Sequence, residues 1–358
     1  MEFDLIHRHF KTPFGPLARA NADTVLLGIG DDCAALQISP GQNLFTSTDT
    51  LVEGVHFFSD DAPRTTGWKA LACNLSDLAA SGATPLGFTL NLSLPEVDET
   101  WLAGFSAGLL EVATRFNCPL VGGDTTSAGL NTLKTVSITV FGQAAASHRG
   151  FNRGHAKADE GIWVSGTPGL ARLGLLLEYQ KRGRLAECCR GAELQKVQAL
   201  LAVLPEHLVR QAVSRLEMPV PRIELGLMLH GLASACLDLS DGLSGDLAHV
   251  LKASEVAAVL SQTSLESIWR HLWPEIDQHA DVAGLLKTLI AQTLKGGDDF
   301  ELCWTAHPRH RDAIQSLGAG LHCVGIIEQG SGLWLRTPGE ERKRISGTSY
   351  NHFAESKN

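Results

Sequence analysis

The pattern of hydrophobic and polar residues along the first half of the chain predicts strands and helices in turn. Residues 88–94 alternate apolar and polar side chains, which is the period of a half-buried strand. Apolar residues recur at helical spacing over 68–80, where Asn74 and Asp77 are three positions apart and therefore share one face of the helix. Asp98 is placed to cap a second amphipathic helix. Further strands are expected at 24–27, 43–48 and 136–142.

A polar and basic stretch, 143–159, separates this half from a second group of predicted elements. We expect it to be a linker, with an N-terminal domain over 1–146 and a C-terminal domain over 147–358. The length of 358 residues supports two domains, because a single core usually stops growing at about 250–300 residues. The mixture of strands and helices indicates the α/β (α+β) class. The strands expected in the second half are 161–166, 235–239, 301–305 and 323–327, with helices over 246–254 and most of 261–294.

Composition narrows the range of functions. The formal net charge of −9 argues against binding to nucleic acid or to an anionic membrane surface, because both need basic patches. The chain has no N-terminal signal sequence and no apolar run of about 18 residues, so we expect a cytoplasmic protein with no membrane partner. Its eight cysteines form no C-x-x-C pair and are expected to be reduced, mostly buried thiols, with disulfides as the less favoured alternative.

Aspartate stands beside glycine at several points where strands are predicted to end, and the strand 43–48 is expected to end at Asp49. Glycine lets the main chain approach a ligand and present N–H groups to anions, and clustered Asp oxygens are what Mg²⁺ selects. A single Asp beside Gly is more often a turn or a helix cap, but several together favour a metal–phosphate site. The candidate metal ligands are Asp32, Asp49, Asp77, Asp124, Asp238 and Asp241.

Other schemes for binding phosphate are missing from the sequence. It contains no G-x-x-x-x-G-K-[ST] loop, no G-x-G-x-x-G after a strand, no protein-kinase signature and no G-x-S-x-G nucleophile turn. His56 follows Asp49 closely, which fits a ligand contact and an ordinary loop histidine equally well. A metal-bridged phosphate site that uses several carboxylates is therefore the hypothesis that the residues favour.

Six segments of the chain resemble thiamine-monophosphate kinase and occur in the order found in that family. They span nearly the whole chain and are 28–32, 47–57, 74–83, 122–125, 238–242 and 296–302. The resemblance implies the fold of aminoimidazole ribonucleotide synthetase, in which an N-terminal sheet domain dimerises into a barrel-like core and a C-terminal α/β domain follows. It also implies that a homodimer converts ATP and thiamine monophosphate into ADP and thiamine diphosphate by direct in-line, Mg²⁺-assisted phosphoryl transfer.

The resemblance further implies roles for individual residues. The catalytic set would be Asp49, Asp77 and Asp124. ATP would contact Gly123, Asp124, Arg153 and Ser240. Thiamine monophosphate would contact His56, Asp298 and Tyr350, of which Tyr350 would suit the thiazolium cation or would simply hold the C-terminal tail. Several Mg²⁺ ions would be bound by Asp32, Ser47, Thr48, Asp49, Asp77, Asp124, Asp238 and Asp241.

The chain departs from the family pattern at two places. It has GGDDFE at 296–301 where the family commonly has GGEDYE, so Asp298 reaches one methylene less far than the family's Glu. The segment between Asp124 and Arg153 is longer than usual. Both departures concern residues to which the resemblance assigns ligand contacts.

Two other functions stay open at this point. An aminoimidazole ribonucleotide or selenophosphate synthetase would also use ATP and Mg²⁺, although the reactive Cys and Lys pair of the latter is not evident. A nucleotide-binding homologue without catalysis is disfavoured, because every matching Asp position is filled.

Overall fold

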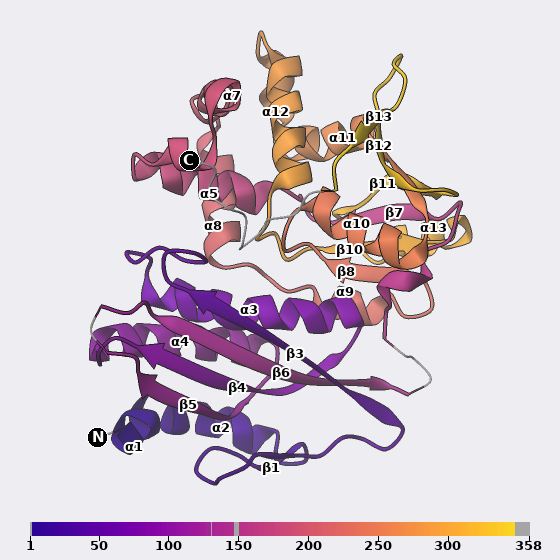
Figure 1. Cartoon of the computed structure of the whole chain (residues 1–358). Helices are drawn as coiled ribbons and strands as arrows, with labels where there is room; N and C mark the ends of the chain where they lie inside the picture. Colours follow the sequence, from indigo (N-terminus) through magenta and orange to yellow (C-terminus); the bar gives the residue numbers. More distant parts are fainter. Residues whose placement is uncertain (1, 130, 147–149, 348–358) are drawn as a thin grey trace. The chain divides into compact units, whose positions relative to one another are not determined.

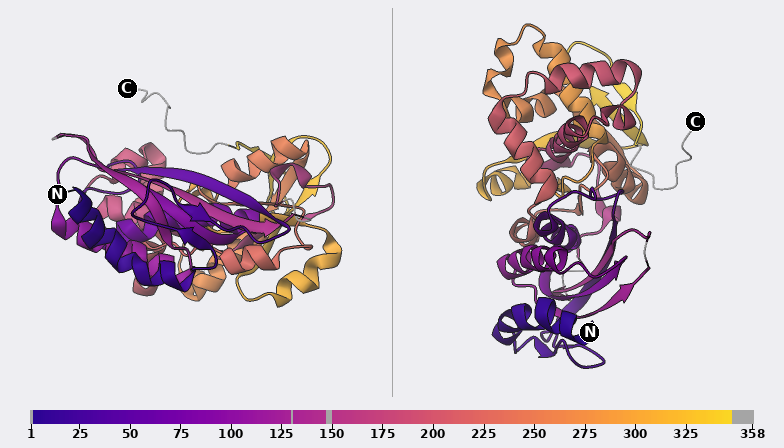
Figure 2. Two further views of the ribbon diagram at one scale, coloured as in Figure 1. Left: turned by 90° about the horizontal axis from the view of Figure 1, so that it is seen from below. Right: turned by 90° about the vertical axis from the view of Figure 1, so that its left-hand side faces the viewer.

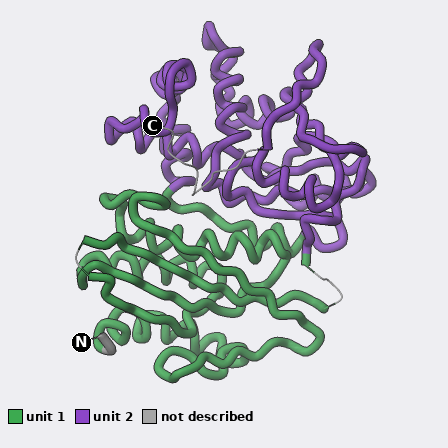
Figure 3. The backbone as a smooth tube through the Cα atoms, in the orientation of Figure 1, with its two compact units in different colours: residues 1–150, 217–228 green, residues 151–216, 229–358 purple. Residues whose placement is uncertain are grey.

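The computed structural model describes residues 2–129, 131–146 and 150–347. The chain forms two compact units, and Figure 3 shows them in different colours. Unit 1 comprises residues 1–150 and 217–228, and unit 2 comprises residues 151–216 and 229–358. Each unit has its own sheet, so the α/β (α+β) class expected from the sequence is confirmed.

Unit 1 is built on a four-stranded sheet in the order β3-β6-β4-β5. The neighbours are antiparallel except for β4 and β5, which are parallel. The helices α3 (Pro63–Ser81) and α4 (Glu99–Arg115) pack together on one face of this sheet (Figures 1 and 2). The strands are β3 (Gln42–Val52), β4 (Thr84–Leu94), β5 (Leu120–Ser127) and β6 (Thr135–Ala145).

Two glycines allow α3 and α4 to pack closely. A Cβ added to Gly67 would lie 2.0 Å from the carbonyl oxygen of Phe105, and one added to Gly108 would lie 1.8 Å from that of Arg64. Real Cβ atoms do not approach backbone so closely, so any other residue at these positions would force the helices apart. The close contact fixes α3, the helix that carries Asn74 and Asp77.

The two helices predicted in this half are confirmed. α3 begins earlier than the first apolar position because Pro63 starts it, and it ends at Gly82, whose φ is 64°. Asp98 caps α4 as expected, since its side chain accepts hydrogen bonds from the N–H groups of Thr100 and Trp101. The strand at 88–94 is also confirmed as part of β4.

One predicted boundary is wrong in a way that matters for the site. β3 does not end at Asp49 but continues to Val52, so Asp49 lies inside a strand. Alternate residues of β3 point to opposite faces of the sheet. Leu51 is buried on one face. On the other face the hydroxyls of Thr48 and Thr50 form hydrogen bonds with those of Thr139 and Ser137 on β6. Because polar side chains occupy both faces here, the strand was expected to end at Asp49 rather than to continue.

The chain returns to unit 1 at 217–228, which includes α9 (Ile223–Met228). The indole N–H of Trp68 donates a hydrogen bond of 2.6 Å to the carbonyl oxygen of Pro219. A Cβ on Gly226 would lie 2.1 Å from the carbonyl oxygen of Ala79, so α9 packs closely on α3. The prolines around 219–221 indicated only a break in the chain and gave no sign of this return.

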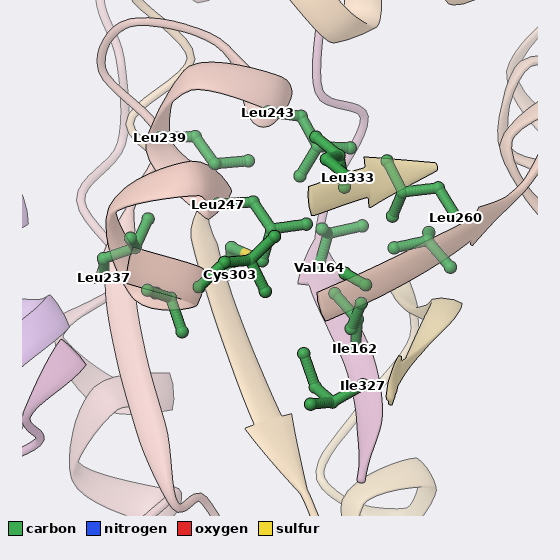
Figure 4. Close-up of a cluster of buried hydrophobic side chains, with 14 of the residues drawn as sticks. Ile162, Val164, Leu237, Leu239, Leu243, Leu247, Leu260, Cys303, Ile327 and Leu333 are labelled. Atoms are coloured by element: carbon green, nitrogen blue, oxygen red, sulfur yellow. The ribbon is translucent and has the colours of Figure 1, made fainter. Parts of the chain in front are cut away.

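Unit 2 has a seven-stranded sheet in the order β13-β12-β9-β11-β7-β10-β8, in which only β12 and β9 pair in parallel. Its core packs α10 against the sheet, and Figure 4 shows Leu243 and Leu247 of α10 beside Ile162, Val164 and Leu260 of the strands. The strands are β7 (Gly161–Ser165), β8 (Ala235–Asp238), β9 (Ala257–Ser261), β10 (Leu302–Ala306), β11 (Leu321–Glu328), β12 (Gly332–Arg336) and β13 (Lys343–Ile345).

Helices make up the rest of unit 2. A second core, which includes Trp269 and Trp273, joins several of them. They include α5 (Leu170–Lys181), α7 (Gly191–Leu201), α8 (Glu206–Glu217), α10 (Leu243–Ser254), α11 (Gln262–Leu272) and α12 (Val282–Lys295). The boundary between the units, 150/151, falls inside the expected linker 143–159. Two parts of that stretch nevertheless have regular structure, because β6 continues to Ala145 and a 3-10 turn, η2 (Arg153–His155), follows.

The structure bears on the expectations about membrane-spanning helices and about cysteines. Within the part of the chain that the structure describes, no helix combines the length and the apolar composition that crossing a membrane requires. All eight cysteines are free thiols, and five of them are buried.

Candidate active site

A carboxylate pair lies between β3 and α3 in unit 1. The Ser47 hydroxyl donates a hydrogen bond of 2.5 Å to Asp77 Oδ2. The backbone N–H of Asp49 donates one of 3.0 Å to Asn74 Oδ1, and the Asn74 amide is held in turn by the carbonyl oxygen of Ala70. Asn74 and Asp77 therefore lie on one face of α3, as their i, i+3 spacing predicted, and in the structure both side chains contact β3.

The electrostatics of this pair fit a divalent cation. Burial, and secondarily the charge of Asp77, raise the pKa of the Asp49 carboxyl to about 6. Two carboxylates that oppose each other's ionisation are the arrangement that a bound cation relieves. Together with the Ser47 hydroxyl they offer only oxygen donors, which is the preference of Mg²⁺. The residues present therefore fit the metal that the family resemblance implies.

We expect the metal-free protein to lose stability as the pH rises through about 6, with the loss reversed by Mg²⁺. The pKa of Asp49 is raised above its unfolded value of 3.8, so its stabilising contribution is present below that value and is lost as the carboxyl ionises. Melting temperatures measured from about pH 5 to about pH 7.5, with EDTA or with Mg²⁺, would test this. The difference between wild type and Asp49→Asn isolates Asp49 from other groups, and a Mg²⁺ effect equal at both pH values would contradict the expectation.

Asp124 is in the same sheet but does not join this pair directly. The register aligns Asp49 with Ile138, Leu90 and Gly123, whereas Asp124 lies opposite Asn91 in the next row. β3 and β5 are the two edge strands, so about 14 Å of sheet separates the two aspartates at three interstrand spacings. Asp124 was expected to follow a strand, but like Asp49 it lies inside one.

Only glycine fits at position 123, next to Asp124, because the backbone there lies too close to β4 for a side chain. Its φ is 153°, and a Cβ there would lie 1.9 Å from the carbonyl oxygen of Leu90. Asp32 lies in the exposed turn between β1 (Val25–Leu27) and β2 (Ala35–Leu36). Among the described residues, no three His, Cys, Asp or Glu side chains come together closely enough to hold a metal ion. Ser47, Asp49 and Asp77 are thus the members of the expected ligand set that the structure brings together in unit 1.

In unit 2 the structure brings together three other expected site residues. Asp298 donates its backbone N–H to the carbonyl oxygen of Ser240 at 2.9 Å, and Ser240, Asp241 and Asp298 are all partly exposed. Asp238 is the last residue of β8 and lies opposite Leu302 of β10, beside the same loops. These residues are the candidate metal, nucleotide and acceptor contacts of unit 2.

Asp246 fixes the turn that carries Ser240 and Asp241. Its Oδ2 accepts hydrogen bonds from the backbone N–H of Ser240 at 3.1 Å and of Asp241 at 3.0 Å. Burial raises the pKa of Asp246 to about 7, although the N–H of Asp241 lowers it. The sequence did not single out Asp246, because nothing in its spacing distinguishes a carboxylate that holds backbone from one that binds a ligand.

His56 is held in one orientation. Its Nδ1 accepts a hydrogen bond of 3.0 Å from the backbone N–H of Val52, so the neutral ring carries its proton on Nε2. The buried Lys69 donates to the carbonyl oxygen of His56 at 3.2 Å and helps to fix the turn. His56 can therefore offer a hydrogen-bond donor to an anionic ligand.

Arg153 begins the turn η2, whose backbone is tied to Ser254 of α10 by a hydrogen bond of 2.7 Å from the hydroxyl to the Arg153 carbonyl oxygen. A cavity of about 450 Å³ lies beside it and is lined by Gly154, His155, Ala156, Lys157 and Ser234. Tyr350, the third expected acceptor contact, lies outside the described residues.

The fold and these residues define the class of protein. Residues 30–144 match the family of AIR synthase related proteins, in its N-terminal domain, and this stretch contains most of the sheet that carries Asp49 and Asp124. The first unit therefore contains a domain similar to the N-terminal domain of AIR synthase related proteins.

Proteins that are similar over the full length of the chain identify its family more closely. The thiamine-monophosphate kinase of Escherichia coli (strain K12) is 37% identical over 361 residues, which cover 99% of this chain and 98% of that protein. The crystal structure of thiamine-monophosphate kinase from Stenotrophomonas maltophilia K279a is 35% identical, with a TM-score of 0.72 over 90% of this chain and 95% of that one. A structure described as AaThiL complexed with AMPPCP and TMP shares the fold at 23% identity, with a TM-score of 0.65 over 88% and 91%. The chain belongs to the thiamine-monophosphate kinase family.

Proposed function

We propose that the protein transfers the γ-phosphoryl group of ATP to the phosphate of thiamine monophosphate, which yields ADP and thiamine diphosphate. The observation that carries this proposal is the 37% identity to a thiamine-monophosphate kinase over 99% of the chain. The oxygen donors of Ser47, Asp49 and Asp77 support it, because phosphoryl transfer depends on positioned metal ions more than on a covalent enzyme group.

Each group of site residues has a part in this reaction. Bound Mg²⁺ would neutralise the charge that builds up on the transferred group. Asp49, Asp77 and Asp124 are the proposed catalytic metal ligands, and Asp32, Ser47, Thr48, Asp238 and Asp241 complete the metal set. Gly123, Arg153 and Ser240 are proposed to bind ATP with Asp124. His56, Asp298 and Tyr350 are proposed to bind the acceptor.

The chemistry of the acceptor removes the need for a general base. A phosphate monoester has a second pKa of about 6, so it is largely a dianion at neutral pH and can attack directly in line. His56 would orient it by donating from Nε2, as the Val52 contact fixes the ring. The proposed role of the protein is therefore to position two anions and to hold the metal ions that offset their repulsion.

We also propose that the protein works as a cytoplasmic homodimer that pairs through the sheet of unit 1. The face opposite α3 and α4 carries hydroxyls from neighbouring strands, including Thr48, Thr50, Ser137 and Thr139, with Thr48 and Thr50 exposed. Leu44, on the same face of β3, is 49% exposed, so this face offers an apolar side chain as well as hydroxyls to a second sheet. The division of roles between residues 1–146 and 147–358 is likewise part of the proposal.

The experiment that tests the function is a product assay with the purified chain, ATP and Mg²⁺. We expect ADP and thiamine diphosphate to form in equal amounts when thiamine monophosphate is present, and neither when EDTA replaces Mg²⁺. Thiamine, which lacks the phosphate nucleophile, is the matched control acceptor. Binding of ATP with no product from thiamine monophosphate would contradict the proposal and would favour a nucleotide-binding homologue.

A further inference from the structure

Asp299 and Glu301, two acidic residues of the 296–301 segment, are buried in unit 2, although they stand within three positions of the partly exposed Asp298 in the sequence. Asp299 is 1% exposed and Glu301 is 0% exposed, whereas Asp298 is partly exposed. We infer that Asp299 is a positioning residue that holds Asp298 beside Ser240 in the geometry needed to bind the phosphate acceptor. The part of this inference that concerns the acceptor rests on the proposed function.

The side chain of Asp299 joins the segment to the start of α5. Its Oδ2 accepts from the backbone N–H of Gly169 at 2.5 Å, and its Oδ1 accepts from that of Ala171 at 3.0 Å. These N–H groups have no partner within the helix, and the positive end of the helix dipole favours a carboxylate there. One carboxylate thus satisfies two helix donors and fixes the position of residue 299.

The backbone on both sides of Asp299 needs such support. Asp298 has a φ of 65° and Phe300 has a φ of 48°, which is the left-handed region that residues other than glycine rarely adopt. A residue in this conformation is strained and persists only when its surroundings hold it in place. The strain is greatest for Phe300, because its side chain is bulky.

The same strained conformation ties the segment to the β8 end. The N–H of Asp298 donates to the carbonyl oxygen of Ser240 at 2.9 Å, and the N–H of Phe300 donates to that of Leu239 at 2.8 Å. A Cβ on Gly297 would lie 2.3 Å from the carbonyl oxygen of Ser240, so the two segments touch. Releasing Asp299 from α5 would let residue 298 move relative to Ser240.

Ser240 would keep its own position if Asp299 were changed. Asp246 holds the N–H groups of Ser240 and Asp241 independently of the 296–301 segment. A change at Asp299 should therefore affect the site at Asp298 more than the site at Ser240. Under the proposed function, this means that binding of thiamine monophosphate weakens while binding of ATP does not.

The test compares Asp299→Asn with wild type by amide hydrogen exchange and by steady-state kinetics. Asn offers one acceptor oxygen where the carboxylate offers two, so the N–H of either Gly169 or Ala171 loses its partner. We expect exchange at the Asp298 and Phe300 amides to quicken by about tenfold or more, because the variant leaves one buried N–H group without its partner and so loosens the hold on residue 299. KM for thiamine monophosphate should rise by about tenfold, with KM for ATP within about twofold of wild type.

Glu160→Gln is the matched control in the same unit. Glu160 is 2% exposed and accepts hydrogen bonds from the Lys157 N–H at 3.0 Å and from the Ser234 hydroxyl at 2.5 Å. It stands just before the first residue of β7, whereas Ser165, which contacts Glu301, is the last residue of that strand. Its loss should lower the melting temperature without changing either KM. Asp299→Glu, which keeps the carboxylate and both acceptor oxygens but is one methylene longer, is the second variant for the same measurements if Asp299→Asn does not fold.

Two outcomes would overturn the positioning role of Asp299, and a third concerns the proposed function. Unchanged exchange at both amides and an unchanged KM for thiamine monophosphate would overturn the positioning role of Asp299. An equal rise in both KM values would also overturn it, because it would indicate a general loss of structure. Failure of the wild type to form thiamine diphosphate would refute the proposed function, whereas the exchange measurement would still decide whether Asp299 holds Asp298.

Discussion

Replacing Asp77 with Asn is expected to remove most of the activity while leaving unit 1 folded. The substitution removes the charge of one of the two carboxylates that fit Mg²⁺, and loss of one group that stabilises transition-state charge lowers kcat by on the order of 100-fold or more. The Asn oxygen can still accept the Ser47 hydrogen bond, so α3 and β3 keep their contact. Because the Asp77 charge also opposes ionisation of Asp49, the metal-free variant should be at least as stable as wild type.

The measurement is turnover at saturating Mg²⁺, ATP and thiamine monophosphate, together with the melting temperature in EDTA. Asp98→Asn is the matched control, because it makes the same chemical change at a helix cap, where Asn is as good as Asp. That variant should keep wild-type activity. Turnover of Asp77→Asn within about threefold of wild type would show that Asp77 is not a ligand of the reacting metal.

Much of unit 1 could be predicted because its patterns are local. The alternation of 88–94 and the helical spacing of 68–80 depend on neighbours in the sequence, and both elements are confirmed. The shared face of Asn74 and Asp77 was also predicted, and the structure shows that this face contacts β3, a contact that the helical spacing did not predict. Asp49 was misplaced at a strand end because an inward-facing Asp in a strand is rare unless a ligand or partner compensates it.

The return of 217–228 to unit 1 could not be predicted. It depends on a contact between Trp68 and Pro219, which are 151 positions apart, and no periodicity records such a contact. The same limit applies to the carboxylates of unit 2. Asp298 and Asp299 are adjacent and chemically identical, and only the position of the α5 start decides that one is buried and the other is partly exposed.

Replacing Arg215 with Met is expected to give the largest loss of stability among the substitutions considered for unit 2. Arg215 Nη2 lies 2.5 Å from Glu301 Oε1, and the two side chains are 16% and 1% exposed. Removing the guanidinium leaves the Glu301 charge buried, and breaking a buried ion pair in this way costs about 3–5 kcal/mol. Gly166 lies close to the same oxygen, because a Cβ there would lie 2.1 Å from Oε1, so the carboxylate has little room to turn toward water.

Urea unfolding followed by tryptophan fluorescence would measure the change in the free energy of unfolding. Arg210→Met is the matched control on the same helix, since its partner Glu206 is exposed and such surface pairs contribute about 0–1 kcal/mol. Adding Glu301→Gln to Arg215→Met should recover most of the loss, because the amide carries no charge and can still accept from the Ser165 hydroxyl. If Arg215→Met cost no more than Arg210→Met, the pair would not be holding α8 to the strand that follows the 296–301 segment.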